Sequence, residues 1–277
     1  MSQRTPKRRR SGPVRGAVRI GLAAALLAGF AASFGACSKP PPTFLEDVPS
    51  AEELYREGLS ILEGRRRFLF FRTVDYQSAI DTFQQIVDNY PYSDYAVRAE
   101  LRIADSYFDQ GKYEEALSYY RDFVDLHPQH EDVPYTMYRA ALCYYRQSRS
   151  ANRDQTATRK SIEYLDQLIR RHPHAPQIRE AEVLWQELRT RLGEHAMQIG
   201  DFYLEREEFE SAAGRYQSVL DEFPGLGLDA QALYKLGLCY NAMNRDDDAK
   251  RIFEVILRNY QGTEVAEAAA DLVPAAK

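Results

Sequence analysis

The pattern of small, large and polar residues repeats along most of this chain of 277 residues. Five segments end in related tripeptides, which begin at Asn89 (NYP), Leu126 (LHP), Arg171 (RHP), Glu222 (EFP) and Asn259 (NYQ). Twelve residues before the end of each tripeptide stands a small residue, namely Ala79, Ala116, Ser161, Ala212 and Ala249. A large residue follows four positions later, namely Phe83, Tyr120, Leu165, Tyr216 and Phe253. Because residues four apart share one helix face, the pattern predicts five helices of similar construction.

A second set of small residues lies upstream, and each pairs with a large residue three positions later. Its members are Gly58 with Ile61, Ala104 with Tyr107, Ala141 with Tyr144, Gly200 with Tyr203 and Gly237 with Tyr240. Small residues allow two helices to cross closely, and proline disfavours helical backbone in the residue before it. This alternation is typical of tetratricopeptide repeats, which pair two antiparallel helices in each unit. The sequence therefore predicts an all-α tetratricopeptide-repeat superhelix of about five helix pairs.

The spacing between equivalent positions shows where the array is irregular. The small residues of the second helices are 37 residues apart between Ala79 and Ala116 and again between Ala212 and Ala249. The interval from Ser161 to Ala212 is 14 residues longer than this. That excess has helical composition from Gln177 to Arg206 and predicts a long bridging helix. An insertion of nine residues surrounds the run RRRFLFFR at Arg65–Arg72. It predicts either a continuation of the first helix or a contact with a partner or with lipid headgroups.

The first 36 residues differ from the rest of the chain in charge and hydropathy. Seven cations and no acid precede an apolar run from Ile20, which is typical of a secretion signal. The segment Phe34-Gly35-Ala36-Cys37 resembles the box that ends bacterial lipoprotein signals. This resemblance predicts cleavage before Cys37 and a covalent S-diacylglycerol and N-acyl lipid on that residue, with no other cofactor. An uncleaved membrane anchor and a secreted protein with a stray cysteine are the alternatives.

The residues after Cys37 predict a tether and a location. Pro40, Pro41, Pro42 and Pro49 favour an extended segment. By resemblance to enterobacterial lipoproteins, Ser38 favours the outer membrane, with the protein anchored by lipid on the periplasmic face. The predicted segments are a lipoprotein signal peptide (1–36), a lipidated cysteine and tether (37–50), an N-terminal module of repeats one to three (51–175), a long bridging helix that runs into repeat four (176–206), a C-terminal module of repeats four and five (207–264) and a C-terminal tail (265–277).

Charge excludes one large class of partner. The formal net charge changes from −5 to −12 when the seven cations of the leader are removed. Nucleic-acid binding needs clustered Lys and Arg at the phosphates, so an acidic body argues against it. We therefore expect no nucleic-acid partner.

The sequence offers little chemistry for catalysis. Cys143 and Cys239 occupy equivalent core positions in different repeats, which favours two buried thiols over a disulfide. The five histidines are His127, His130, His172, His174 and His195. We expect loop and helix histidines rather than metal ligands, because further ligands are not nearby in sequence. The chain has no glycine-rich phosphate loop, nucleophile elbow or HExxH motif, so we do not expect an enzyme.

The first helices of a tetratricopeptide array line a concave groove. The residues one and four positions after the small residue, and those three and six positions before it, tend to face this groove. In the N-terminal module the residues at these positions are Tyr55, Asp105, Phe108, Tyr135, Tyr138 and Tyr145. Aromatic side chains supply a large contact area with little entropy loss, so they suit an extended peptide. The alternative for each residue is packing between repeats.

The lipoprotein box, the tether, the five repeats and the long helix together resemble the BamD (ComL) family of outer-membrane assembly lipoproteins, over about residues 44–262. The more specific parts are NYPYS from Asn89, HPQHEDVPYTMYRAAL from His127, NRDQ from Asn152 and the unit between Gly200 and Pro224. The insertion, the long basic leader and Phe34 depart from the family pattern.

The resemblance implies a non-catalytic lipoprotein scaffold of the β-barrel assembly machinery. It implies that the C-terminal repeats dock on the periplasmic domains of the barrel-forming subunit. It also implies that the N-terminal groove engages unfolded outer-membrane protein segments or accessory subunits. The lipid anchor would insert into the bilayer. The alternative function is a periplasmic adaptor lipoprotein for envelope division or polysaccharide export.

Overall fold

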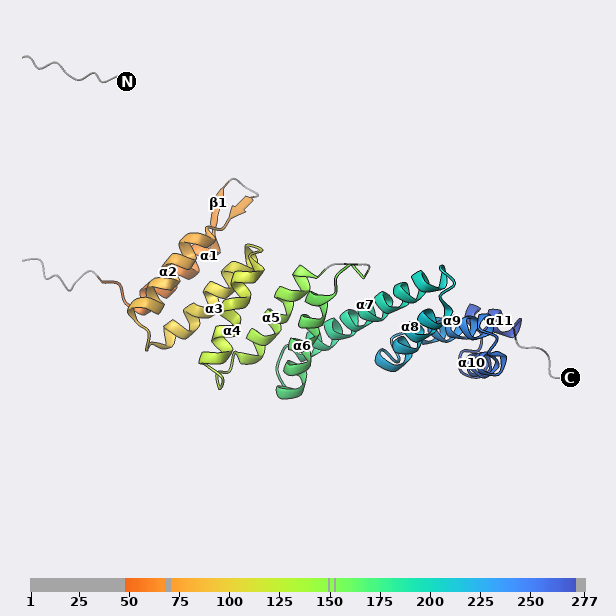
Figure 1. Ribbon diagram of the computed structural model, residues 1–277. Coiled ribbons are helices and arrows are strands. Elements are labelled where there is room, and N and C mark those ends of the chain that lie inside the picture. Colours follow the sequence, from red (N-terminus) through yellow and green to blue (C-terminus); the bar gives the residue numbers. More distant parts are fainter. Residues whose placement is uncertain (1–47, 68–70, 149, 152, 273–277) are drawn as a thin grey trace, which may run out of the picture. The chain divides into compact units, whose positions relative to one another are not determined.

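The computed structural model describes residues 48–67, 71–148, 150–151 and 153–272, with side chains described outside 65–72. The described residues from Pro49 onward belong to one compact unit. The described residues of this unit contain eleven helices and one two-stranded hairpin (Figure 1). Their bounds are α1 Ala51–Glu63, β1 Arg65–Arg67, β2 Phe71–Thr73, α2 Tyr76–Asn89, α3 Asp94–Asp109, α4 Tyr113–Leu126, α5 Val133–Gln147, α6 Thr156–Arg171, α7 Ile178–Leu204, α8 Phe209–Glu222, α9 Asp229–Ala242, α10 Asp246–Asn259 and α11 Glu264–Ala270.

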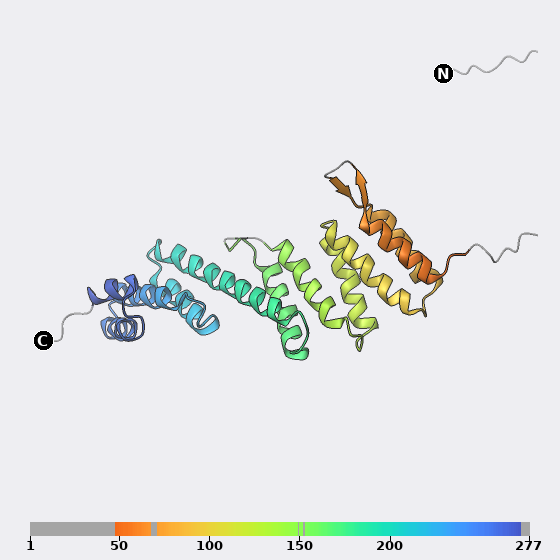
Figure 2. The same cartoon turned by 180° about the vertical axis from the view of Figure 1, so that it is seen from behind.

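Each helix packs mainly against its neighbours in sequence, as expected for an array of helix pairs. The pairs are α1–α2, α3–α4, α5–α6, α7–α8 and α9–α10, and they follow one another in chain order in both views (Figures 1 and 2). This arrangement confirms the all-α tetratricopeptide-repeat fold predicted from the sequence.

The small and large residues of the sequence pattern meet where the two helices of a repeat cross. A Cβ atom built on Gly58 would lie 2.5 Å from Phe83 Cε1, and one built on Gly200 would lie 2.5 Å from Tyr216 Cε1. The same relation places Gly237 against Phe253 at 2.6 Å. A side chain at these glycines would collide with the ring, so a residue without Cβ allows the close crossing.

The five second helices also end in the same way. Their C-cap residues are Tyr90, His127, His172, Phe223 and Tyr260, with φ between −132° and −124° and ψ between 35° and 57°. Four of them precede proline, which disfavours helical backbone in the preceding residue. The tripeptides of the sequence pattern therefore mark the ends of α2, α4, α6, α8 and α10.

The long helix α7 contributes to two parts of the hydrophobic core. Near its N-terminus, Ala181, Leu184 and Leu188 pack in the cluster that also holds residues of α3 to α6. Near its C-terminus, Met197 packs in the cluster formed with α8 and α9. One helix of 27 residues thus serves as the bridge and as the first helix of the fourth repeat.

The insertion after α1 is a β-hairpin, so the prediction that it continues the first helix is wrong. Gly64, with φ of 71°, follows the last residue of α1, and its left-handed backbone ends the helix. The strands β1 and β2 then pair antiparallel, with Arg66 directly opposite Arg72. Arginine and phenylalanine alone do not distinguish a helix from a strand, whereas the glycine does mark the helix end.

The predicted C-terminal tail also contains structure. Residues Glu264–Ala270 form α11, which begins at the N-cap Thr263 and packs against α9 and α10. Ala266 and Ala269 are buried against Phe253 and Ile256. The short helix thus covers an apolar side of the fifth repeat.

The anchor predicted at Cys37 and the tether from Pro40 to Pro42 lie outside the described residues. Among the helices that the structure describes, none combines the length and the apolar character needed to cross a bilayer. Near the start of the described residues, Tyr90 Oη donates a hydrogen bond to the carbonyl oxygen of Pro49 at 2.8 Å.

Candidate partner-binding groove

The six predicted groove residues lie on three first helices: Tyr55 on α1, Asp105 and Phe108 on α3, and Tyr135, Tyr138 and Tyr145 on α5. The structure does not give them one common role. It brings Asp105, Phe108 and Tyr135 into a polar network, links Tyr55 to the edge of that network, and places Tyr138 and Tyr145 in a separate pocket.

Asp105 is the centre of the network. Its Oδ1 accepts hydrogen bonds from Tyr120 Oη at 2.6 Å and from Tyr135 Oη at 2.7 Å. Arg139 Nη2 lies 3.3 Å from the same oxygen, and only 13% of the Asp105 side chain is exposed. Burial and the adjacent Asp105 charge raise the pKa of Tyr120 and of Tyr135, so both hydroxyls remain donors.

Arg139 is held on several sides. Its guanidinium lies 3.9 Å from the centre of the Phe108 ring, and its Nε donates to Tyr120 Oη at 3.0 Å. Arg102 extends the network toward α1, because its Nε donates to Tyr55 Oη at 3.3 Å and its Nη1 lies 3.6 Å from Asp105. Four of the six predicted residues therefore belong to this network or contact it.

Sequence reasoning missed Arg139, Arg102 and the polar role of Tyr120. A signal was present, because Arg102 and Arg139 both stand two residues before the small residue of a first helix. Lys235 occupies the same position in repeat five.

The network has a counterpart in the C-terminal repeats. Asp201 Oδ1 accepts a hydrogen bond from Tyr216 Oη at 2.7 Å and lies 2.6 Å from Lys235 Nζ. The carboxylate and the tyrosine are 15 residues apart in both networks, and the carboxylate and the cation are 34 apart. Each network joins the first helix of one repeat, its second helix and the first helix of the next repeat. Polar contacts thus fix the register between repeats at two equivalent junctions.

The C-terminal network is the more exposed of the two. The Asp201 and Lys235 side chains are 39% and 29% exposed, whereas the N-terminal Asp105 and Arg139 are 13% and 17% exposed. Gln231 and Leu204 stand where the N-terminal network has Tyr135 and Phe108. The extra aromatic residues explain the deeper burial of the N-terminal network.

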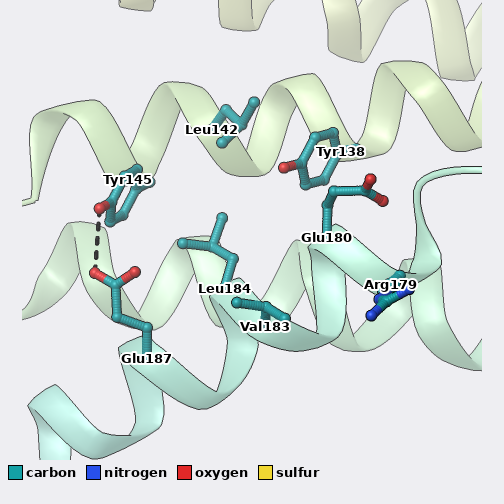
Figure 3. A pocket seen from close by; sticks show the side chains of 8 residues that line it. All are labelled: Tyr138, Leu142, Tyr145, Arg179, Glu180, Val183, Leu184 and Glu187. Carbon is teal, nitrogen blue, oxygen red and sulfur yellow. Dashed lines mark hydrogen bonds between the residues drawn. The ribbon is translucent and has the colours of Figure 1, made fainter.

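The other two predicted residues line a pocket between α5 and α7. It has a volume of about 410 Å³ (Figure 3). The lining residues are Tyr138, Leu142, Tyr145, Arg179, Glu180, Val183, Leu184 and Glu187. Leu142, Val183 and Leu184 form its apolar surface, and Val183 is 63% exposed. The pocket offers an apolar contact to another molecule.

The two ends of the pocket differ in charge. At one end Tyr145 Oη donates to Glu187 Oε1 at 3.1 Å (Figure 3), and that oxygen also pairs with Arg191 Nη2 at 2.9 Å. At the other end, partial burial and the nearby charge of Glu180 raise the pKa of Tyr138. Glu180 and Arg179 both lie at this end (Figure 3), and neither forms an ion pair with a described residue.

The remaining titratable residues serve local roles. Burial raises the pKa of the Cys143 thiol to about 12 and of the Cys239 thiol to about 11, and both cysteines are unpaired. His127 Nε2 lies 2.9 Å from Glu100, and the ring of His195 contacts the carbonyl oxygen of Ala151. Within the part of the chain that the structure describes, no three His, Cys, Asp or Glu residues gather as metal ligands would.

Comparisons with known proteins agree on one family. A family profile described as YfiO, outer membrane lipoprotein, matches residues 50–255 of the chain. The chain is 26% identical over 243 residues to the outer membrane protein assembly factor BamD of Caulobacter vibrioides, covering 88% of this chain and 76% of that protein. It is 28% identical over 211 residues to the protein of that name from Rickettsia prowazekii, covering 76% and 80%. A solved complex of the yeast Sti1 TPR2AB domain with pHSP90 matches at 16% identity and a TM-score of 0.40, covering 79% and 81%.

Proposed function

Because the chain belongs to the YfiO family of outer membrane lipoproteins, we propose that it acts as an outer-membrane protein assembly factor. It is a non-catalytic scaffold of the β-barrel assembly machinery. The observation that carries the proposal is the span of the family match. Residues 50–255 extend from the start of α1 into α10 and include both polar networks and the pocket. A rigid array of this kind acts by holding partners in a fixed relation rather than by chemistry.

The scaffold is held at the outer membrane by lipid. Cys37 receives the S-diacylglycerol and N-acyl groups, and the protein faces the periplasm. Acyl chains contribute about 0.8 kcal/mol per buried CH₂, so two or more chains give stable anchoring. The sequence around Cys37 and the family description support this anchor.

Two surfaces of the array serve different partners. The C-terminal repeats dock on the periplasmic domains of the barrel-forming subunit. The pocket between α5 and α7 receives an apolar side chain of an unfolded outer-membrane protein segment or of an accessory subunit. Its exposed Val183 and Glu180, which forms no ion pair with a described residue, suit a segment in which a basic residue lies beside an apolar one.

Copurification tests the assembly role. The lipidated protein is extracted from membranes in detergent, and an outer-membrane barrel protein with periplasmic repeat domains is expected to come with it. If division or polysaccharide-export proteins come instead, the adaptor function replaces the assembly function. A Cys37→Ser chain tests the anchor separately, because it should leave the membrane fraction while keeping its helical circular dichroism spectrum. A chain that stays with membranes contradicts anchoring through Cys37.

A substitution in the pocket tests its role without disturbing the core. Val183→Asp adds a charge at a side chain that is 63% exposed, so the fold should be retained while partner capture falls at least tenfold. Leu126→Asp is the matched control, because Leu126 is 67% exposed and does not line the pocket. Equal partner capture by the two variants would show that the pocket is not part of the binding surface.

A further inference from the structure

A second hollow lies between α4 and α6, with a volume of about 480 Å³. Helix α5 packs against both of these helices and contributes Met137 and Tyr144 to the lining. Met137 is buried, so α5 forms the floor, while α4 and α6 form the walls. The hollow shares no residue with the pocket between α5 and α7. It is therefore a separate site, and we call it the α4–α6 hollow.

The wall that α6 provides is long enough for a short peptide. Its lining residues are Lys160, Glu163, Tyr164, Gln167 and Arg171, which share one face of the helix because they follow the helical spacing of three or four residues. The helix rises about 16 Å between the first and the last of them. An extended chain of about five residues has that length. The shape of the hollow therefore suits a short extended segment.

Several hydrogen-bond donors in the hollow have no acceptor among the described residues. The side chains of Arg121 and Arg171 are exposed, and neither forms an ion pair or a hydrogen bond with a described residue. The hydroxyls of Tyr144 and Tyr164 likewise make no hydrogen bond with a described residue. Burial raises the pKa of Tyr164, so its hydroxyl keeps its proton and can donate. Such donors suit a ligand with several acceptor oxygens.

Positive charge is in excess at the hollow, although the chain without its leader has a formal charge of −12. Lys160 Nζ pairs with Glu163 at 2.9 Å, so these two charges compensate each other. Asp125 then stands against the two arginines, Arg121 and Arg171. The remaining net positive charge attracts an acidic ligand to the hollow, whereas the body as a whole repels it.

The tyrosine rings of the hollow remain available for contact. Tyr144 and Tyr164 stand three residues after the small residues of their helices, and their ring centroids are 5.6 Å apart. In the equivalent pair of repeat two, Tyr107 and Tyr119 are 5.5 Å apart, and Lys112 Nζ lies 5.6 Å from the centre of the Tyr107 ring. Among the described residues, no cation lies over the rings of repeat three in this way. These rings can therefore contact an aromatic side chain of another molecule.

From these observations we infer that the α4–α6 hollow binds an acidic peptide segment that carries an aromatic side chain. Carboxylates of the segment accept hydrogen bonds from Arg121 and Arg171, because a guanidinium matches a carboxylate with two parallel hydrogen bonds. The aromatic side chain lies against Tyr144 and Tyr164. A phosphate or a lipid headgroup would match the arginines but would leave the tyrosine rings and Val124 without a contact. The inference goes beyond the assembly role and does not depend on it.

Fluorescence anisotropy with a defined peptide tests the site. The protein is the lipidated chain in a nonionic detergent, and the probe is fluorescein-labelled Asp-Glu-Phe-Glu-Asp. We expect saturable binding with a dissociation constant on the order of 10–100 μM, because a short flexible peptide loses much freedom, and weaker binding at high salt. Asp-Glu-Gly-Glu-Asp should bind about tenfold more weakly, because it lacks the aromatic contact. Lys-Arg-Phe-Arg-Lys should not bind.

Two double variants of equal charge locate the contact. Arg121→Gln with Arg171→Gln should weaken binding about tenfold or more, because two charge-assisted hydrogen bonds are lost. The control is Arg159→Gln with Arg170→Gln, which should bind as the parent does. Both control residues are exposed on α6, each stands one position before a cation of the hollow, and neither lines it. Tyr164→Phe keeps the ring and removes only the hydroxyl, so it should weaken binding about two- to tenfold.

Three results would overturn the inference. The first is no saturable binding of the acidic probe by the parent protein. The second is an equal loss in the two double variants, because total charge rather than the hollow would then hold the peptide. The third is displacement of the probe as readily by inorganic phosphate as by the unlabelled peptide, which would assign the arginines to a phosphate ligand. None of these results bears on the copurification test of the assembly role.

Discussion

Replacing Asp105 with alanine should destabilise the array far more than the equivalent replacement of Asp201. In the N-terminal network the change leaves two tyrosine hydroxyls without their acceptor and removes the carboxylate nearest to Arg139. All of these groups are partly or fully buried, and breaking such a network costs about 3–5 kcal/mol. In the C-terminal network one hydroxyl and one ammonium lose a partner that is 39% exposed, so water replaces part of the loss. We expect about 1–2 kcal/mol there.

Urea denaturation followed by circular dichroism measures the difference. With a slope of about 1–3 kcal/mol per molar urea, Asp105→Ala should lower the midpoint by about 1–5 M and Asp201→Ala by less than half as much. Since repeat arrays can unfold in parts, native-state hydrogen exchange should show the loss of protection in α3 to α5 for the first variant and in α7 to α9 for the second.

Asp105→Asn separates the charge from the hydrogen bonds. The amide oxygen still accepts from a hydroxyl, but the ionic contact with Arg139 is gone, so the loss should lie between those of the parent and of Asp105→Ala. Equal destabilisation by Asp105→Ala and Asp201→Ala would refute the reasoning, because burial would then not set the strength of the two networks.

Other predictions concern packing and the thiols. Gly237→Ala should lower the urea midpoint, because its Cβ would lie 2.6 Å from Phe253. Gly214→Ala, whose Cβ would meet no atom within 4 Å, should raise the midpoint, because the free energy of unfolding should increase by about 0.5–1 kcal/mol. Neither Cys143 nor Cys239 should react with iodoacetamide in the native protein at pH 8, while both should react in urea; rapid native labelling would contradict their burial. Because burial raises both thiol pKa values from 9.0 to about 12 and 11, the unfolded chain loses these protons first. The thiol contribution to stability should therefore decline as pH rises above about 9, and a chain with both cysteines replaced by alanine should show a shallower decline.

Much of the fold could be predicted because each repeat is specified by residues that are close together in sequence. A small residue, a large residue four positions later and a closing proline all act within one helix or one crossing. The close contact of Gly58 with Phe83 shows that the pattern predicted a packing relation as well as a helix. The hairpin and α11 were not predictable in the same way, because neither belongs to a repeat. Their form depends on the positive φ of Gly64 and on the packing of Ala266 and Ala269 against Phe253 and Ile256.

The groove was predictable only in outline. The sequence identified the helix positions near it, but the rule that selected Asp105 and Tyr135 also selected Tyr138. The difference arises from neighbours that are distant in sequence: Tyr135 donates a hydrogen bond to Asp105, 30 residues away, whereas α7 leaves an open pocket beside Tyr138. Helical periodicity gives the face of a residue but not the partner across the interface.

The sequence by itself determined the repeat fold, the long bridging helix and the resemblance to an outer-membrane lipoprotein family, because these rest on local periodicity and short motifs. Only the tertiary structure decided which polar residues satisfy one another and which remain available. It paired Asp105 with Arg139 and Asp201 with Lys235, and it left Val183 exposed beside a pocket between α5 and α7. Hydrogen bonds and ion pairs need atoms within about 3–4 Å, and the folding of separate helices against one another sets those distances.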